Sequence, residues 1–243
     1  MPTYYCHECA REHNLIAPIM PASGLPASGT YSLEKFIKHT APKDVYAVNS
    51  VFDEALQRHP IRVLGYCLMP THWHVVLWPA ADGDLTAFLR WLTLTHSVRW
   101  HKHYQSTGSG HVYQNRFKAF AIAEDDHLLM VLRYVERNPL RAGLVRRAED
   151  WPWSSLACRL AGGDEAARRL HPGPVAVADD WLHMVNKRQT EAELQAVRVS
   201  VARGRPYGSA GWVARVVKRL GLPSTVRPRG RPRKQPTDGG QAD

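Results

Sequence analysis

Two short β-prone segments, residues 61–68 and 72–78, are separated only by Met69-Pro70-Thr71. Short runs rich in valine, leucine and aromatic residues are typical of strands, and a short connection indicates neighbouring strands of one sheet. The second segment begins His72-Trp73-His74. Side chains alternate between the two faces of a strand, so His72 and His74 are expected side by side on one face, with Trp73 on the other.

Helix-like and strand-like segments surround this pair of strands. Apolar spacing and capping residues predict, in chain order, a helix over 45–58, a helix over 84–104, a strand over 111–123, a helix from Asp125 or Asp126 to about Arg137, and helices over 190–203 and 210–221. The order α-β-β-α-β-α, followed by a helical extension, indicates an α+β fold built on an antiparallel sheet.

Composition excludes several classes of protein. The chain has 243 residues, of which 44% are hydrophobic and 22% charged, as in a folded protein of one large or two small domains. Four cysteines do not make a disulfide framework in a chain of this length. The sequence contains no signal peptide and no apolar run long enough to span a membrane, so we expect a cytoplasmic protein.

The positive charge is concentrated at the C-terminus. The whole chain carries a net charge of +10, and residues 201–243 hold ten lysines and arginines against two acids. Arg203-Gly204-Arg205-Pro206 recurs as Arg229-Gly230-Arg231-Pro232, followed by Arg233-Lys234. This pattern resembles the core of an AT-hook, whose arginines enter a narrow minor groove. The alternative is a disordered end that only improves solubility.

Two further segments carry candidate chemistry. The imidazoles of His72 and His74 can together bind a metal ion. Tyr134 and Asn138 are four residues apart, so a helix that continues to Asn138 places a tyrosine nucleophile beside an amide oxygen, a third metal ligand. The alternative is a core tyrosine and an asparagine that ends a helix before Pro139.

The strand over 111–123 alternates basic and aromatic residues with polar ones. Its segment His111-Val112-Tyr113-Gln114-Asn115-Arg116-Phe117-Lys118 can line a nucleic-acid groove, with Arg116 and Lys118 near phosphates and an aromatic ring available for stacking. The alternative is an ordinary half-exposed strand.

Three segments in this order, "YCLMPTHWHVVLWP", "GHVYQNRFKAF" and "RYVERNPLRAGLVRRAEDWPWSS", resemble the single-tyrosine HUH transposases, specifically the REP-associated tyrosine transposases. The resemblance covers roughly Val45 to Ala157 and, more loosely, the tail through "RGRPRK". It implies a ferredoxin-like antiparallel sheet with helices on one face, followed by a helical, basic C-terminal extension.

The resemblance also implies an activity. His72, His74 and Asn138 would hold Mg²⁺ or Mn²⁺, and Tyr134 would cut single-stranded DNA beside a hairpin through a 5′-phosphotyrosine intermediate. The ligands alone leave Zn²⁺ and Ni²⁺ open. The protein would act as a monomer or a homodimer. Residues expected to contact DNA are Arg116, Lys118, Arg133, Arg137, Arg229, Arg231, Arg233 and Lys234.

The N-terminus departs from this family. We find no clear equivalent of the family's first strand within residues 1–44, although Tyr31–Ile37 or Val45–Val48 could substitute for it. Cys6 and Cys9 have half of a zinc-ribbon spacing and lack a second Cys-x-x-Cys pair, so both a zinc site and none stay open. A missing strand would put activity in doubt.

The predicted organisation therefore has four parts: an atypical, foreign or truncated segment over 1–44, a catalytic domain over 45–158, a linker and helix over 159–200, and a basic DNA-binding tail over 201–243. The alternative function is a catalytically inactive or domesticated DNA-binding relative. A relaxase or replication initiator would share the chemistry but not the substrate. A hydrolytic metalloenzyme is disfavoured, because the sequence places no carboxylate beside the histidine pair as a general base.

Overall fold

The computed structural model describes residues 30–37 and 42–227. Its core is a four-stranded antiparallel sheet of β1 (Thr30–Ile37), β2 (Arg62–Leu68), β3 (His72–Trp78) and β4 (Tyr113–Ile122), in the order β2-β3-β1-β4. Helix α2 (Pro42–Arg58) connects β1 to β2, and α3 (Asp84–His103) connects β3 to β4. This β-α-β-β-α-β order, with each crossover passing one strand, is the ferredoxin-like arrangement that was predicted.

The remaining helices follow β4. They are α4 (Asp126–Glu136), α5 (Asn138–Arg141), the 3₁₀ turn η2 (Ala148–Asp150), α6 (Ser155–Ala161), α7 (Gly163–Arg169), α8 (Trp181–Asn186), α9 (Glu191–Arg203), α10 (Ala210–Arg219) and α11 (Pro223–Val226). The expected helical extension is therefore present. The segment expected as a linker with one helix also contains α7 and α8, whose few turns give little periodic signal.

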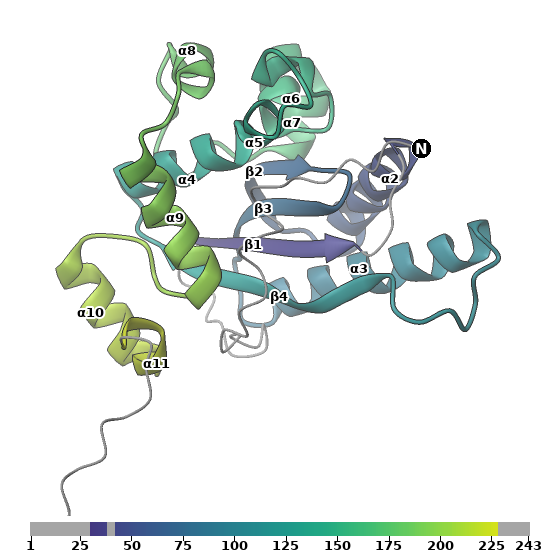
Figure 1. Cartoon of the computed structure of the whole chain (residues 1–243), viewed down its shortest axis with the longest axis horizontal. Coiled ribbons are helices and arrows are strands. Elements are labelled where there is room, and N and C mark those ends of the chain that lie inside the picture. The colour runs from purple at the N-terminus through teal and green to yellow at the C-terminus, as the bar shows by residue number, and fades with distance from the viewer. Residues whose placement is uncertain (1–29, 38–41, 228–243) are drawn as a thin grey trace, which may run out of the picture.

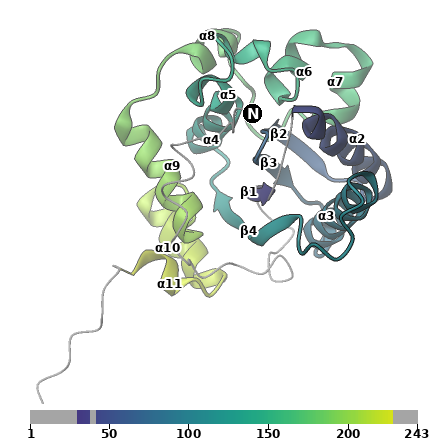
Figure 2. The same ribbon diagram turned by 45° about the vertical axis from the view of Figure 1, so that its right-hand side comes forward.

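Helices cover both faces of the sheet (Figure 1 and Figure 2). One face packs against the two crossover helices, through side chains such as Phe52 of α2 and Phe88 of α3. The opposite face packs against α4 and α9, through Val131 and Val197 among others. The prediction of helices on one face is therefore correct for the ferredoxin-like unit itself. The segments after β4 add a second helical layer that buries the other face.

The first strand is present: the expectation that it has no clear equivalent is wrong, and the candidate Tyr31–Ile37 is confirmed as the strand that takes its place. Residues Thr30–Ile37 form β1, which lies between β3 and β4, and Val45–Val48 lies within α2. The sequence of β1 alternates apolar Tyr31 and Leu33 with polar residues only at its start, and the alternation breaks before Phe36, where the register with β4 also shifts. The reason for doubting activity on grounds of a missing strand is therefore removed.

Both edges of the sheet are partly covered by later parts of the chain. At the β2 edge, the N–H of Leu68 donates to the carbonyl of Trp153 at 2.9 Å. At the β4 edge, Tyr207 forms a parallel bridge to Ile122, and its N–H donates to the carbonyl of Ala121 at 2.8 Å. These contacts satisfy backbone groups that an edge strand would otherwise expose.

Candidate active site

Strand β3 presents the two predicted histidines on one face of the sheet. His72 and His74 are both buried, with ring centroids 4.9 Å apart and ring planes nearly perpendicular at 89°. Trp73, between them, packs into the core on the opposite face. In the register with β1, Phe36 lies opposite His72 and Glu34 lies opposite His74. The side-chain alternation predicted from the sequence is confirmed.

Helix α4 carries Tyr134 to the histidines. Asp125 caps the helix by accepting a hydrogen bond from the N–H of His127 at 2.9 Å, and apolar residues including Leu128 and Val135 bury one face against the sheet. Tyr134 is 5% exposed, and its ring centroid lies 6.0 Å from that of His74 in an edge-to-face arrangement. The nucleophile candidate therefore lies directly beside the histidine pair.

Asn138 completes the cluster, although α4 does not continue through it. Helix α4 ends at Glu136, and the short α5 begins at Asn138 with Pro139 in its first turn. Asn138 is fully buried, and its Nδ2 lies 3.3 Å from Nε2 of His72. The structure thus brings together Tyr134, Asn138 and the two histidines.

Arg141 is a member of this site that the sequence analysis missed. Its Cζ lies 4.1 Å from the centroid of the Tyr134 ring, which is a cation–π contact. Its guanidinium donates to Oδ1 of Asn138 at 2.8 Å and to the carbonyl of Tyr134 at 3.3 Å. The spacing Tyr134-x3-Asn138-x2-Arg141 was a usable signal, since residues three, four and seven apart share a helix face.

The donor groups here fit a divalent cation in their chemistry. Among the described residues, no group of three His, Cys, Asp or Glu side chains could hold a metal ion, so a three-ligand site needs the amide of Asn138. Cys67 lies opposite His74 in the register of β2 and β3, but burial raises the pKa of its thiol well above the usual value. It is therefore a neutral thiol in the core. The fit requires Asn138 to offer its oxygen, which here accepts from Arg141.

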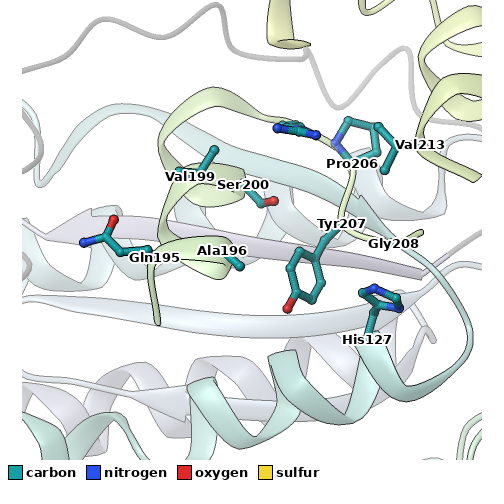
Figure 3. Close-up of a pocket in the computed structure, with 10 residues that line it drawn as sticks. His127, Gln195, Ala196, Val199, Ser200, Pro206, Tyr207, Gly208 and Val213 are labelled. Atoms are coloured by element: carbon teal, nitrogen blue, oxygen red, sulfur yellow. The ribbon is translucent and has the colours of Figure 1, made fainter. Parts of the chain in front are cut away.

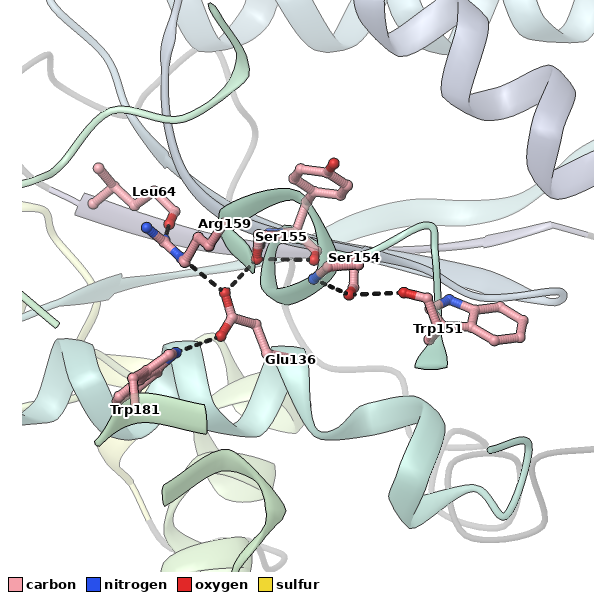
Figure 4. Close-up of polar contacts among 9 residues, drawn as sticks. Leu64, Glu136, Trp151, Ser154, Ser155, Arg159 and Trp181 are labelled. Atoms are coloured by element: carbon pink, nitrogen blue, oxygen red, sulfur yellow. Dashed lines mark hydrogen bonds and ion pairs between the residues drawn. The ribbon is translucent and has the colours of Figure 1, made fainter. Parts of the chain in front are cut away.

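A buried carboxylate fixes the end of α4 that carries Tyr134 (Figure 4). Glu136 is 0% exposed; its Oε1 accepts from Oγ of Ser155 at 2.5 Å and from Nε of Arg159 at 3.3 Å, and its Oε2 accepts from Nε1 of Trp181 at 2.6 Å. Ser155 Oγ also accepts from the N–H of Tyr66 on β2 at 2.9 Å. One carboxylate therefore joins α4 to β2, α6 and α8.

Arg133, which the resemblance placed among the DNA contacts, has a structural role instead. Its side chain is buried, and it donates to the carbonyls of Met184 and Lys187, each at 2.7 Å, and pairs with Glu193 at 3.5 Å. These contacts attach α8 and the start of α9 to α4. The prediction for Arg133 is therefore wrong, because tertiary partners use the donors that a phosphate would need.

Arg137 is half-buried and lines a groove between α5 and α8. It donates to the carbonyls of Val185 and Asn186. Burial and the nearby guanidinium groups of Arg133, Arg141 and Arg188 lower its pKa. The groove has a volume of about 680 Å³ and is lined by Arg137, Leu140, Arg146, Arg147, Asp180, Leu182, His183 and Asn186. A concave surface with three arginines and one acid favours an anionic ligand.

The other predicted DNA contacts are only partly within the described structure. Lys118 is half-buried on β4; Arg116 lies on the same strand, with its side chain outside the described part. Arg229, Arg231, Arg233 and Lys234 lie outside the described residues, as do Cys6 and Cys9.

The first Arg-Gly-Arg-Pro copy belongs to the folded body. Arg203 ends α9, and Gly204 has a φ of 63°, the left-handed conformation of a glycine that terminates a helix. Pro206 and Tyr207 follow along the edge of β4, where they line a pocket with His127 and Val213 (Figure 3). This copy therefore ends a helix and covers a sheet edge, and the AT-hook reading does not apply to it.

Among the described residues, we find no helix with the length and apolar character needed to cross a bilayer.

Comparisons with known proteins find similar sequences over this part of the chain. The family described as "Transposase IS200 like" matches residues 35–138, which include both histidines, Tyr134 and Asn138. A protein of Haemophilus influenzae described as a REP-associated tyrosine transposase is 26% identical over 116 residues, which are 44% of this chain and 65% of that protein. The REP-associated tyrosine transposase of Escherichia coli is 25% identical over 104 residues, 43% of this chain and 59% of that protein.

These matches span less than two thirds of either relative's length. A solved structure, titled as a REP-associated tyrosine transposase bound to a REP hairpin, aligns with a TM-score of 0.48 and 16% identity, covering 69% of this chain and 95% of that chain. Over residues 35–138 the chain is thus similar to the IS200-like transposases, and both relatives that it resembles are REP-associated tyrosine transposases.

Proposed function

We propose that this protein cuts and rejoins single-stranded DNA beside a hairpin, with Tyr134 as the nucleophile and His72, His74 and Asn138 as the ligands of Mg²⁺ or Mn²⁺. The observation that carries the proposal is the convergence of these four side chains in one buried cluster, from β3, α4 and α5. A core tyrosine and a helix-ending asparagine would have no reason to meet a histidine pair on the strand face.

In the proposed reaction, the phenol oxygen of Tyr134 bonds to the scissile phosphorus while the bond from phosphorus to the 3′ oxygen breaks. The tyrosine loses its proton, the leaving 3′ oxygen gains one, and the DNA on the 3′ side of the cut becomes a 5′-phosphotyrosine. Attack by a 3′-OH reverses these changes, so rejoining needs no external energy source. A divalent metal held by His72, His74 and Asn138 would stabilise the negative charge on the phosphate oxygens.

The residues of the chain position this chemistry. The β3 backbone holds the two imidazoles, Glu136 anchors α4, and Arg141 places a positive charge over the face of the Tyr134 ring. This cation–π contact holds the ring of the proposed nucleophile in place beside the histidines. The similarity to two REP-associated tyrosine transposases supports the choice of hairpin DNA as the substrate class for this chain.

The experiment that tests the proposal is a covalent-trapping assay. The full chain is incubated with single-stranded hairpin DNA labelled at its 5′ or 3′ end, with Mn²⁺ or EDTA, and run on a denaturing protein gel. We expect a protein band that carries only the label 3′ of the cut and that disappears with EDTA. Salt-dependent binding on native gels without any adduct would support the DNA-binding relative instead.

We further propose that the groove between α5 and α8 carries the phosphates of the bound strand. Replacing Arg146 and Arg147 together by alanine should weaken binding of single-stranded DNA. The slope of log K against log salt should become shallower by about 1.4, since each lost phosphate contact removes about 0.7. Fluorescence anisotropy from low to high salt measures the slope.

The matched control for this prediction is the double replacement of Arg90 and Lys102 by alanine. Both residues are exposed on α3, across the sheet from the groove, and the change in net charge is the same. If the slope changes equally in the two double variants, the effect comes from the net charge of the protein alone. That result would contradict the proposal that the groove binds phosphates.

A further inference from the structure

We propose that Arg141 is a positioning residue that sets which end of the Asn138 amide faces His72, and thereby opposes the binding of a divalent cation in the DNA-free protein. This inference rests on the function proposed above. It concerns the state of the site before substrate arrives, in which His72, His74 and Asn138 are all buried.

The hydrogen bonds around Asn138 have a single consistent direction. A guanidinium has only donors, so the amide atom 2.8 Å from Nη2 of Arg141 is the oxygen. The amide nitrogen then faces Nε2 of His72 at 3.3 Å and donates to it. Nε2 therefore carries the lone pair, and the ring proton on Nδ1 donates to Oγ1 of Thr71 at 3.0 Å.

In this arrangement Nε2 of His72 has the lone pair that a metal needs, but the oxygen of the Asn138 amide points away from the metal position. The lone pair of His72 Nε2, which a metal ligand must offer, is engaged by the amide N–H of Asn138. An amide coordinates a hard cation through its oxygen, which here points to Arg141. Turning the amide by half a rotation would bring the oxygen toward His72, but it would set the NH₂ group against the guanidinium, donor against donor.

Arg141 is held in place by further contacts, so it cannot easily move aside when the Asn138 amide rotates. Besides Asn138, it contacts the face of the Tyr134 ring and the carbonyl of Tyr134. The same guanidinium thus holds the nucleophile and turns the third ligand away from the cation position. Its removal should have two opposite effects: tighter metal binding in the absence of DNA, and slower formation of the tyrosine adduct.

The test is a titration of the full chain with Mn²⁺ in the absence of DNA, with free Mn²⁺ measured by electron paramagnetic resonance. In Arg141→Gln, the new side-chain oxygen can accept from the turned amide, and we expect the Kd for Mn²⁺ to fall about tenfold, the size of one relieved donor conflict. Arg141→Lys keeps both the donor and the charge, and its Kd should stay close to that of the original protein.

Removing a positive charge near the site would also tighten metal binding, so a charge control is needed. Arg137→Gln removes the charge of a neighbouring arginine that makes no contact with Asn138 among its described hydrogen bonds. We expect a smaller gain, below about threefold, because this guanidinium is bonded to the carbonyls of α8 and not to the amide of Asn138. Thermal unfolding of each variant confirms that it is folded.

An unchanged Kd in Arg141→Gln would overturn the inference, and so would an equal gain in Arg137→Gln. Loss of Mn²⁺ binding in Arg141→Gln would overturn it as well, because the guanidinium would then support the metal site. Since the titration contains no DNA, its result is independent of the trapping assay. An absent adduct in the original protein would count against the proposed function and leave the order of Mn²⁺ affinities to be judged separately.

Discussion

Tyr134→Phe is expected to lower formation of the covalent DNA adduct by at least about a thousandfold, because it removes the attacking oxygen and nothing else. Phenylalanine retains the aromatic ring that meets His74 edge-on and lies under Arg141. The packing of α4 should therefore survive. The measurement is the time course of the labelled protein band on a denaturing gel, with substrate in excess.

Two controls make this result specific. The melting temperature of Tyr134→Phe should stay within a few degrees of the original protein, and its affinity for the same DNA should change by less than about threefold, since one neutral hydroxyl contributes roughly one hydrogen bond at most. An adduct that persists in Tyr134→Phe would assign the nucleophile to another residue. Loss of DNA binding together with the adduct would indicate a structural tyrosine.

Glu136→Ala is expected to cause the largest loss of stability, about 3–5 kcal/mol, because it removes the carboxylate that pairs with Nε of the half-buried Arg159 and the acceptor of the indole N–H of buried Trp181. Urea unfolding followed by circular dichroism measures the loss. The stability of Glu136→Gln should lie between that of Glu136→Ala and that of the original protein. An amide keeps one acceptor oxygen, but three donors surround it.

Glu54→Ala is the matched control for this prediction. Glu54 pairs with Arg99 on the surface, between α2 and α3, where both side chains are more than a third exposed. Exposed pairs contribute about 0–1 kcal/mol, so this variant should unfold almost as the original protein does. Equal losses in Glu54→Ala and Glu136→Ala would show that the buried network has no special part in holding α4.

The spacing of apolar residues along the sequence was sufficient to predict the strand with the two histidines and the longer helices. The alternation around Trp73 placed both histidines correctly, and the periodic helices were found within a few residues of their ends. The position of Asn138 beside Tyr134 was predicted from one continuous helix. In the structure α4 ends before Arg137 and α5 begins at Asn138, yet the Asn138 side chain still reaches His72. The pattern was right about proximity because a single turn at the junction keeps the spacing.

Features that depend on distant parts of the chain were not accessible in this way. Arg133 has the composition and position of a phosphate contact, and only the folding of α8 and α9 onto α4 shows that carbonyls use its donors. Arg203 and Arg205 look like a groove-binding pair until α9 and the β4 edge are in place. β1 was ambiguous because eight residues give a weak signal, and its place in the sheet depends on β3 and β4.

Tyr207 pairs with the edge strand β4 and so protects it from aggregation. During synthesis this protection comes late. All four strands and every proposed catalytic residue precede Tyr207 in the sequence. A ribosome therefore finishes the portion that holds the proposed catalytic residues while the β4 edge of the sheet still offers unpaired amides and carbonyls to a neighbouring nascent chain. Truncation between α8 and Tyr207 should consequently yield a protein whose chemistry is encoded in full but whose solubility is poor.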